Sequence, residues 1–207
     1  MYRHMIWDFD GTLFDTYEVM GKALQLTFQM NGIDEPLEEI IRLMKISGIV
    51  AYKHYEEKYQ VDEKLIREYE TIRRDMEPEL CKPYPGVLEL LRYGKETGRC
   101  HYLFTHRGES SVAFLKRYEI YDCFTECITS RNKFERKPSP AGILFLMDKY
   151  QIRPEEAIMI GDRELDILSG KNAGIDACFF DEEGLNCQTA DYNIRNMMEL
   201  YNIIKAE

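Results

Sequence analysis

Short apolar runs that alternate with longer amphipathic stretches constrain the fold of this chain more than any other feature. The runs have the length of buried strands, and the stretches between them place apolar residues three and four positions apart, as helices do. This alternation predicts an α/β fold in which helices wrap a parallel sheet. The expected strands are residues 4–7, 101–105, 127–129, 157–160 and 177–180, and the expected helices are residues 87–97, 111–118, 141–150 and 164–173.

One long segment breaks the alternation. Residues 17–81 show helical periodicity and many charges but no run typical of a strand. Residues 82–86, which contain two prolines and a glycine, have the composition of a hinge. We therefore expect an α/β core formed by residues 1–14 and 83–207, and an all-helical insertion formed by residues 15–82. Within the insertion, the expected helices are residues 19–30, 37–44, 50–59 and 63–76.

Composition excludes several classes of protein. A net charge of -10 and a pI near 5.0 oppose nucleic-acid binding, which needs a dense basic surface. No apolar run is long enough to span a bilayer, and the chain reaches Asp8 too early for the apolar core of a signal peptide. The 6 cysteines form no C-x-x-C pair and are typical of free thiols in a reducing compartment. We expect a cytoplasmic protein, a monomer or weak dimer, that binds neither nucleic acid nor membrane.

Two aspartates directly follow the first apolar run. Asp8 and Asp10 are two residues apart in extended chain, so both side chains can face the carboxyl end of the strand, where open parallel sheets bind ligands. In such a pair, one carboxylate can stay ionised as a nucleophile while the other is protonated and acts as a proton donor. The alternative is a simple turn, in which Gly11 and Thr12 are present only because the backbone conformation of the turn favours them. An EF-hand is excluded, because Leu13 takes the position of its glycine.

A second acidic pair follows the fourth apolar run. If a helix begins near Asp162, then Asp162 and Asp166 are four residues apart on one helical face. Magnesium prefers oxygen ligands, and one or two carboxylates with a substrate phosphate suffice to hold it. The alternative is that Asp162 is the helix N-cap and that Asp166 is solvated.

Two further positions complete a candidate site. Thr105 ends the second apolar run and precedes His106 and Arg107, where a hydroxyl and backbone N–H groups at a helix N-terminus could bind a phosphoryl oxygen. Lys137 lies just before another expected helix and could balance the charge of a phosphorylated aspartate. Each position alone is also consistent with a strand end or a basic turn. Their conjunction with the two acidic pairs, at the carboxyl ends of strands in one sheet, favours a phosphoryl-transfer site.

These motifs, in this order, resemble those of the haloacid dehalogenase superfamily. The matching residues are Asp8 to Thr12, Thr105, Lys137 and Gly161 to Asp166. The resemblance implies a Rossmann-like core with an inserted helical cap domain, as in the subfamily that includes phosphoglycolate phosphatases and beta-phosphoglucomutases.

The resemblance also implies roles for the matching residues. Asp8 would be the nucleophile, Asp10 the general acid and base, and Thr105 and Lys137 the phosphoryl-holding groups. Mg²⁺ would be bound by Asp8, by the main-chain carbonyl of Asp10 and by Asp162, with Asp166 as a supporting or alternative ligand. Relatives that remove halide lack the second aspartate, so Asp10 favours phosphate esters.

The expected substrate is a small phosphorylated metabolite, and the expected enzyme is a magnesium-dependent phosphatase. In this cap class a loop of the insertion contacts substrate, which singles out Lys45 and Ser47. His106 and Arg107, which follow Thr105 in the core, are further candidates for substrate binding. A helix-ending turn explains Lys45 and Ser47 equally well. A phosphosugar mutase shares the catalytic residues and stays open. A phosphorylated receiver domain is opposed by the order of the motifs and by the helical insertion.

Overall fold

The computed structural model describes residues 2–205, and the chain forms two compact units. One unit contains the chain up to Phe14 and the chain from Pro83 onward, and the other is Asp15–Lys82. At the two passages between the units, β2 (Phe14–Asp15) pairs with β3 (Lys82–Pro83) in a two-stranded sheet. The helical segment is therefore an insertion into the first unit.

The first unit is built on a six-stranded sheet with the order β5-β4-β1-β6-β7-β8, in which every neighbouring pair is parallel. In chain order these strands correspond to the 3-2-1-4-5-6 arrangement of doubly wound nucleotide-binding folds. The strands are β1 (His4–Trp7), β4 (Cys100–Phe104), β5 (Phe124–Ile128), β6 (Ala157–Gly161), β7 (Asp176–Phe180) and β8 (Tyr192–Ile194).

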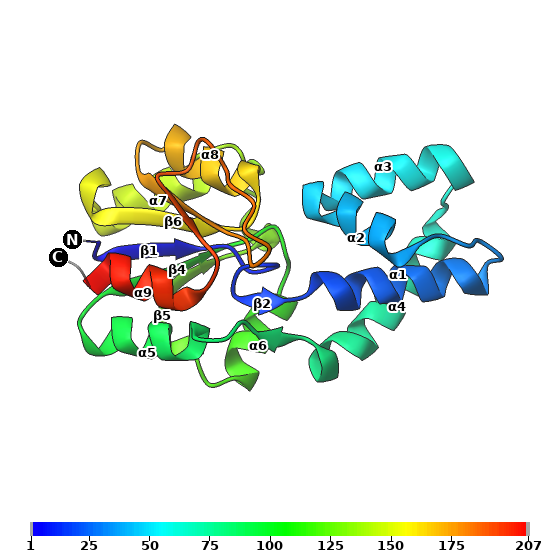
Figure 1. Ribbon diagram of the computed structural model, residues 1–207, viewed down its shortest axis with the longest axis horizontal. Helices are drawn as coiled ribbons and strands as arrows, with labels where there is room; N and C mark the ends of the chain where they lie inside the picture. The colour runs from blue at the N-terminus through cyan, green and yellow to red at the C-terminus, as the bar shows by residue number, and fades with distance from the viewer. Residues whose placement is uncertain (1, 206–207) are drawn as a thin grey trace. The chain divides into compact units, whose positions relative to one another are not determined.

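Helices cover both faces of this sheet. Figure 1 shows α7 and α8 on one face and α5 and α9 on the other. Three short 3₁₀ turns, at Tyr121–Cys123, Ser130–Asn132 and Pro154–Glu156, precede or follow strands. The helices of this unit are α5 (Val87–Glu96), α6 (Ser110–Arg117), α7 (Ala141–Tyr150), α8 (Glu164–Asn172) and α9 (Met197–Lys205).

The central strands are buried on both faces, which explains their continuous apolar sequences. Met5, Ile6 and Trp7 of β1 are 0% exposed, and all of β6 is buried. A strand covered by helices on both faces has no solvated side, so its sequence is apolar throughout rather than alternating.

The topology fixes where a site can form. After β1 the chain passes to β4 and β5 on one side, and it then returns to β6 on the other side of β1. The connections therefore diverge between β1 and β6, and a crevice opens at the carboxyl ends of these two strands. Residues that follow Trp7 and Gly161 lie at this position.

The inserted unit contains only helices apart from its boundary strands. Its apolar faces meet around Phe28, Ile40 and Tyr55, which are at most 2% exposed. Two of its helices begin at capping side chains: Ser47 Oγ accepts the Val50 N–H, and an Asp62 carboxylate oxygen accepts a backbone N–H of the next helix. The helices are α1 (Tyr17–Met30), α2 (Leu37–Ile46), α3 (Gly48–Tyr59) and α4 (Glu63–Leu80).

The α/β fold class predicted from the sequence is confirmed, and all 6 cysteines are free thiols as expected. Some boundaries were wrong. β5 begins at Phe124 rather than at residue 127, and β8 and α9 were not predicted. Helix α8 begins at Glu164, as predicted, so the condition for pairing Asp162 with Asp166 on one helical face, a start near Asp162, is not met. Between residues 2 and 205, no helix is both long and apolar enough to cross a membrane.

Candidate active site

The first acidic pair lies at the end of the central strand β1. The Asp8 N–H donates to the Ile160 carbonyl at 2.9 Å, which holds the chain against β6 for one residue beyond β1. The Asp8 side chain is 1% exposed, whereas that of Asp10 is 19% exposed. Gly11 then turns the chain with a φ of 77°, a conformation that favours glycine. Asp8 is therefore a buried carboxylate, and Asp10 reaches solvent.

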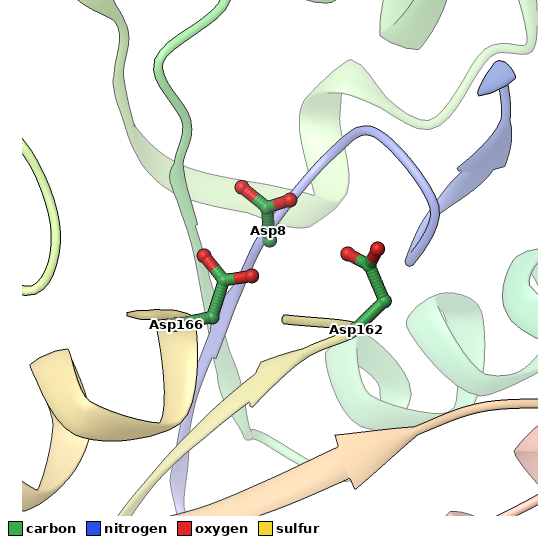
Figure 2. Close-up of side chains that lie close together, drawn as sticks. All are labelled: Asp8, Asp162 and Asp166. Atoms are coloured by element: carbon green, nitrogen blue, oxygen red, sulfur yellow. The ribbon is translucent and has the colours of Figure 1, made fainter. Parts of the chain in front are cut away.

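Three carboxylates gather at the carboxyl ends of β1 and β6. Asp8, Asp162 and Asp166 each place one oxygen within 4.8 Å of the others. Figure 2 shows Asp8 after β1, Asp162 after β6 and Asp166 on α8, with their carboxylates turned toward a common space. Asp162 precedes α8, so the expectation of a shared helical face was wrong. The turn between β6 and α8 brings the two side chains together instead.

A glycine makes the close approach of Asp166 possible. A Cβ on Gly161 would lie 2.3 Å from the Asp166 Cβ, much closer than two carbon atoms can approach. Gly161 therefore allows the first turn of α8 to fold back onto the end of β6. Asp166 is 0% exposed as a result, so the alternative in which it is a solvated residue is wrong.

Two cations face the buried carboxylates. Lys137 Nζ, with a fully buried side chain, lies 2.6 Å from Asp8 Oδ1 and 2.7 Å from Asp166 Oδ1. Arg163, which the sequence analysis did not single out, lies 3.4 Å from Asp8 Oδ2 through Nη2 and 3.3 Å from Asp166 Oδ2 through Nε. Its position directly after Asp162 was the available signal. The nucleophile candidate thus has a cation near each of its oxygens.

Burial and these cations act in opposite directions on the two acids. Burial and the neighbouring Asp166 raise the pKa of Asp8, and Lys137 and Arg163 offset only part of that rise. Burial would also raise the pKa of Asp166, but Lys137 and Arg163 hold it below its usual range. Asp166 therefore stays ionised as the counter-ion of Lys137, and Asp8 is the carboxylate of the pair with the higher pKa.

The residues after β4 support Lys137. His106 Nε2 accepts the Lys137 backbone N–H at 2.8 Å, which requires an unprotonated nitrogen. Burial, followed by the nearby charge of Lys137, lowers the pKa of His106 to about 3, so the ring stays neutral.

Thr105 Oγ1 accepts the Arg107 N–H at 3.1 Å. That N–H was expected to face a phosphoryl oxygen and is instead engaged within the loop, and α6 begins only at Ser110.

Arg107 contacts the second aspartate of the first pair. Its Nη1 lies 2.7 Å from Asp10 Oδ1, and its side chain is 4% exposed. The expected contact between Arg107 and substrate stays a prediction.

Lys45 and Ser47 belong to the inserted unit. Lys45 lies in the last turn of α2, and Ser47 is the N-cap of α3. Their expected role in substrate binding also stays a prediction.

The donor set fits a hard divalent cation. Asp8, Asp162 and Asp166 together could hold Mg²⁺, and Lys137 and Arg163 contact both Asp8 and Asp166. Thr12 Oγ1 donates to Asp162 Oδ1 at 3.0 Å and orients that carboxylate. Oxygen donors of this kind, completed by water and substrate phosphate, match the preference of magnesium.

The family model described as Haloacid dehalogenase-like hydrolase matches residues 5–180. The chain belongs to this family of hydrolases, as its motifs predicted. It is therefore an enzyme, and the candidate site contains the residues on which the resemblance was based.

Individual relatives support the same assignment. The phosphoglycolate phosphatase of Vibrio vulnificus is 28% identical over 179 residues, which span 81% of this chain and 78% of that protein. The pyrophosphatase PpaX of Bacillus pumilus is 26% identical over 210 residues, which span 98% and 96% of the two chains. A crystal structure of a haloacid dehalogenase superfamily hydrolase, subfamily IA, from Geobacter sulfurreducens has a TM-score of 0.77 at 23% identity. That match covers 98% of this chain and 100% of the other, and it supports the fold.

Proposed function

We propose that this enzyme is a magnesium-dependent phosphatase that hydrolyses a small phosphate monoester through a phosphorylated Asp8. The observation that carries the proposal is the setting of Asp8. Its carboxylate is 1% exposed, Lys137 Nζ lies 2.6 Å from one oxygen, and the Asp162 carboxylate belongs to the same cluster. A buried carboxylate held between cations is suited to attack an electrophile that itself carries negative charge.

The proposed reaction has two steps. An Asp8 oxygen attacks phosphorus, the ester P–O bond breaks, and Asp10 gives its proton to the leaving alkoxide. Asp10 then takes a proton from water, the water oxygen attacks phosphorus, and the Asp8–phosphate bond breaks to release inorganic phosphate. Lys137 stays beside Asp8 in both steps and offsets charge on the phosphoryl oxygens. When bound, Mg²⁺ would act as a Lewis acid that draws off phosphoryl charge.

The charge balance of the site agrees with a dianionic group. With Asp10 protonated for its first transfer, the carboxylates of Asp8, Asp162 and Asp166 face the cations Lys137, Arg107 and Arg163, which leaves a net charge of about 0. One divalent cation brings the site to about +2, so the loaded site attracts a phosphoryl dianion.

The relatives indicate which substrates deserve testing first. One is named a phosphoglycolate phosphatase and another a pyrophosphatase. We therefore propose a small anionic phosphate ester, with phosphoglycolate as the leading candidate. A mutase on a phosphosugar would use the same residues and is distinguished by its product.

The test is turnover of a panel with phosphoglycolate, inorganic pyrophosphate, a phosphosugar and a generic aryl phosphate. Release of inorganic phosphate should disappear with chelator and return with Mg²⁺. Asp162→Ala should raise the Mg²⁺ concentration for half-maximal rate at least about tenfold, whereas Asp122→Asn, an exposed aspartate of the same unit, should not. An unchanged magnesium requirement in Asp162→Ala would remove Asp162 from the site.

A covalent trap tests the intermediate. Asp10→Asn cannot shuttle a proton, so with an activated aryl phosphate it should phosphorylate Asp8 and then stall. Intact-mass spectrometry after acid quench should show one added phosphoryl group, which Asp8→Asn should lack. A long-lived adduct on the wild type without turnover would instead favour a receiver-like switch.

A further inference from the structure

The ion pair between Arg107 and Asp10 joins two distant parts of the α/β unit. Arg107 follows β4 and Asp10 follows β1, yet Arg107 Nη1 lies 2.7 Å from Asp10 Oδ1. The arginine side chain is 4% exposed, whereas that of Asp10 is 19% exposed. The cation is thus the buried partner, and the carboxylate is the partner that solvent and ligand can reach.

Other contacts fix the guanidinium in place. Arg107 Nε donates to Ser110 Oγ at 2.9 Å. The guanidinium carbon lies 5.3 Å from the centre of the Phe9 ring and 5.6 Å from that of Phe114. Two hydrogen bonds and two aromatic rings therefore restrain one group. Phe9 lies between Asp8 and Asp10 in the sequence. Its ring packs against the Arg107 guanidinium, which in turn binds Asp10.

We infer that Arg107 is a positioning residue, which fixes the Asp10 carboxylate for its two proton transfers. The inference rests on the proposed function. Arg107 holds Oδ1 of Asp10 and so fixes the direction in which the carboxylate faces the alkoxide and the water. A carboxylate with one oxygen fixed keeps its other oxygen in a defined direction, and small misplacements of a catalytic group cost large factors in rate.

This role differs from a direct contact with the phosphoryl group, which the sequence led us to expect. A group that binds substrate phosphate changes KM and the affinity for inorganic phosphate. A group that acts through Asp10 changes kcat and has no effect once Asp10 cannot transfer a proton. The two roles therefore separate in a double-mutant cycle.

The experiment compares wild type, Arg107→Met, Asp10→Asn and the double variant on an alkyl phosphate monoester with Mg²⁺. Methionine keeps an unbranched stem against Phe9 and Phe114 but removes the charge. We expect Arg107→Met to lower kcat by roughly 10²-fold with KM unchanged, and to cause no further loss in the Asp10→Asn background. The inhibition constant of inorganic phosphate should also stay at the wild-type value.

Three further variants serve as matched controls. Arg107→Lys keeps the charge but not the two-point geometry, so it should recover only part of the rate. Ser110→Ala removes the second anchor and should lower kcat about threefold. Arg131→Met, at an exposed arginine paired with Glu109, should leave the rate unchanged.

Several results would overturn the inference. If Arg107→Met lowers the rate of Asp10→Asn by the same factor as that of wild type, or weakens phosphate inhibition, Arg107 contacts substrate. If the wild type hydrolyses no phosphate ester, the proposed function fails and this inference with it. Circular dichroism shows whether Arg107→Met folds. If it does not, Arg107→Lys and Ser110→Ala are each combined with Asp10→Asn instead. Losses of rate that add to the loss caused by Asp10→Asn would overturn the inference.

Discussion

The two units of this enzyme bury their ion pairs to different extents. In the α/β unit, Lys137 and its partners Asp8 and Asp166 have side chains at most 1% exposed. In the helical unit, the pair between Arg42 and Glu39 joins side chains that are 59% and 36% exposed. Glu35 and Glu77 of the helical unit are buried too, but the side chains of their partners Lys58 and Arg73 are 48% and 18% exposed.

We propose that the buried charges are the ones that serve function. Charges on exposed helix faces stay hydrated, so pairing them changes stability little. Removing several charges from water costs free energy, and only good pairing offsets that cost. A fold selected for stability alone could place apolar side chains at the ends of β1 and β6. The buried acids and lysine there are best explained by chemistry that needs a dry, charged site.

The largest expected effect is loss of the proposed nucleophile. Asp8→Asn replaces a carboxylate by a neutral amide that cannot displace an alkoxide, so turnover should fall by about 10⁶-fold. Phosphate release measures it. Asp122→Asn should keep wild-type activity. A rate for Asp8→Asn within tenfold of wild type would place the chemistry elsewhere.

Next in size is the loss of the buried cation. Lys137→Met leaves Asp8 and Asp166 without their closest positive partner, and the free energy of unfolding should fall by about 3–5 kcal/mol. Urea denaturation measures it. Adding Asp166→Asn to Lys137→Met should recover part of the loss, because one unpaired buried charge is removed. A cost below about 1 kcal/mol would show that the pair is not buried in solution.

A buried histidine should make the stability of the α/β unit depend on pH. His101 Nδ1 accepts from Trp7 Nε1 at 3.0 Å, its Nε2 donates to the Leu91 carbonyl at 3.1 Å, and burial lowers its pKa to about 4. Between an unfolded pKa of about 6.5 and this value, the unfolded chain binds a proton that the folded chain does not. The free energy of unfolding should therefore decrease as pH falls through this window, by up to about 3 kcal/mol.

Denaturation of wild type and His101→Asn between pH 7 and 4.5 tests this dependence. The variant should lose stability less steeply as pH falls, whereas His54→Asn in the helical unit should follow wild type. Equal slopes in wild type and His101→Asn would mean that the ring is not buried in its neutral form.

The smallest effect is expected at the surface of the helical unit. Arg42→Met breaks an exposed pair between residues three positions apart in α2, so the free energy of unfolding measured by urea denaturation should barely change. Salt at 0.5 M should remove even this difference, because it screens exposed charges (Debye length on the order of 4 Å). A loss near that of Lys137→Met would erase the contrast between the units.

The prediction of the fold succeeded where burial acts on contiguous residues. The strands expected at residues 4–7, 101–105, 157–160 and 177–180 were each found to within one residue at either end. By contrast, β8 is a three-residue edge strand whose Tyr192 and Asn193 are not buried, so it has no apolar run. The apolar spacing of α9, at Met197, Leu200 and Ile204, was present in the sequence and was not used.

The acids and the lysine of the candidate site were also named from sequence, because each follows or precedes a predictable element. The pairing among them was not. Lys137 and Asp166 are 29 positions apart, and Arg107 and Asp10 are 97 apart. No local pattern relates such positions, and Arg163 was overlooked although it directly follows Asp162 in the sequence.

The sequence by itself determined the family, the α/β class and the acidic motifs at strand ends, since these depend on residue type and short-range spacing. Only the tertiary structure decided which cation meets which acid. Strand order placed β1 beside β6, and Gly161 let α8 close on the strand end, so Asp166 became buried against Lys137. The physical reason is that electrostatic effects depend on distance through space and on exclusion of water, and both arise only after the chain has packed.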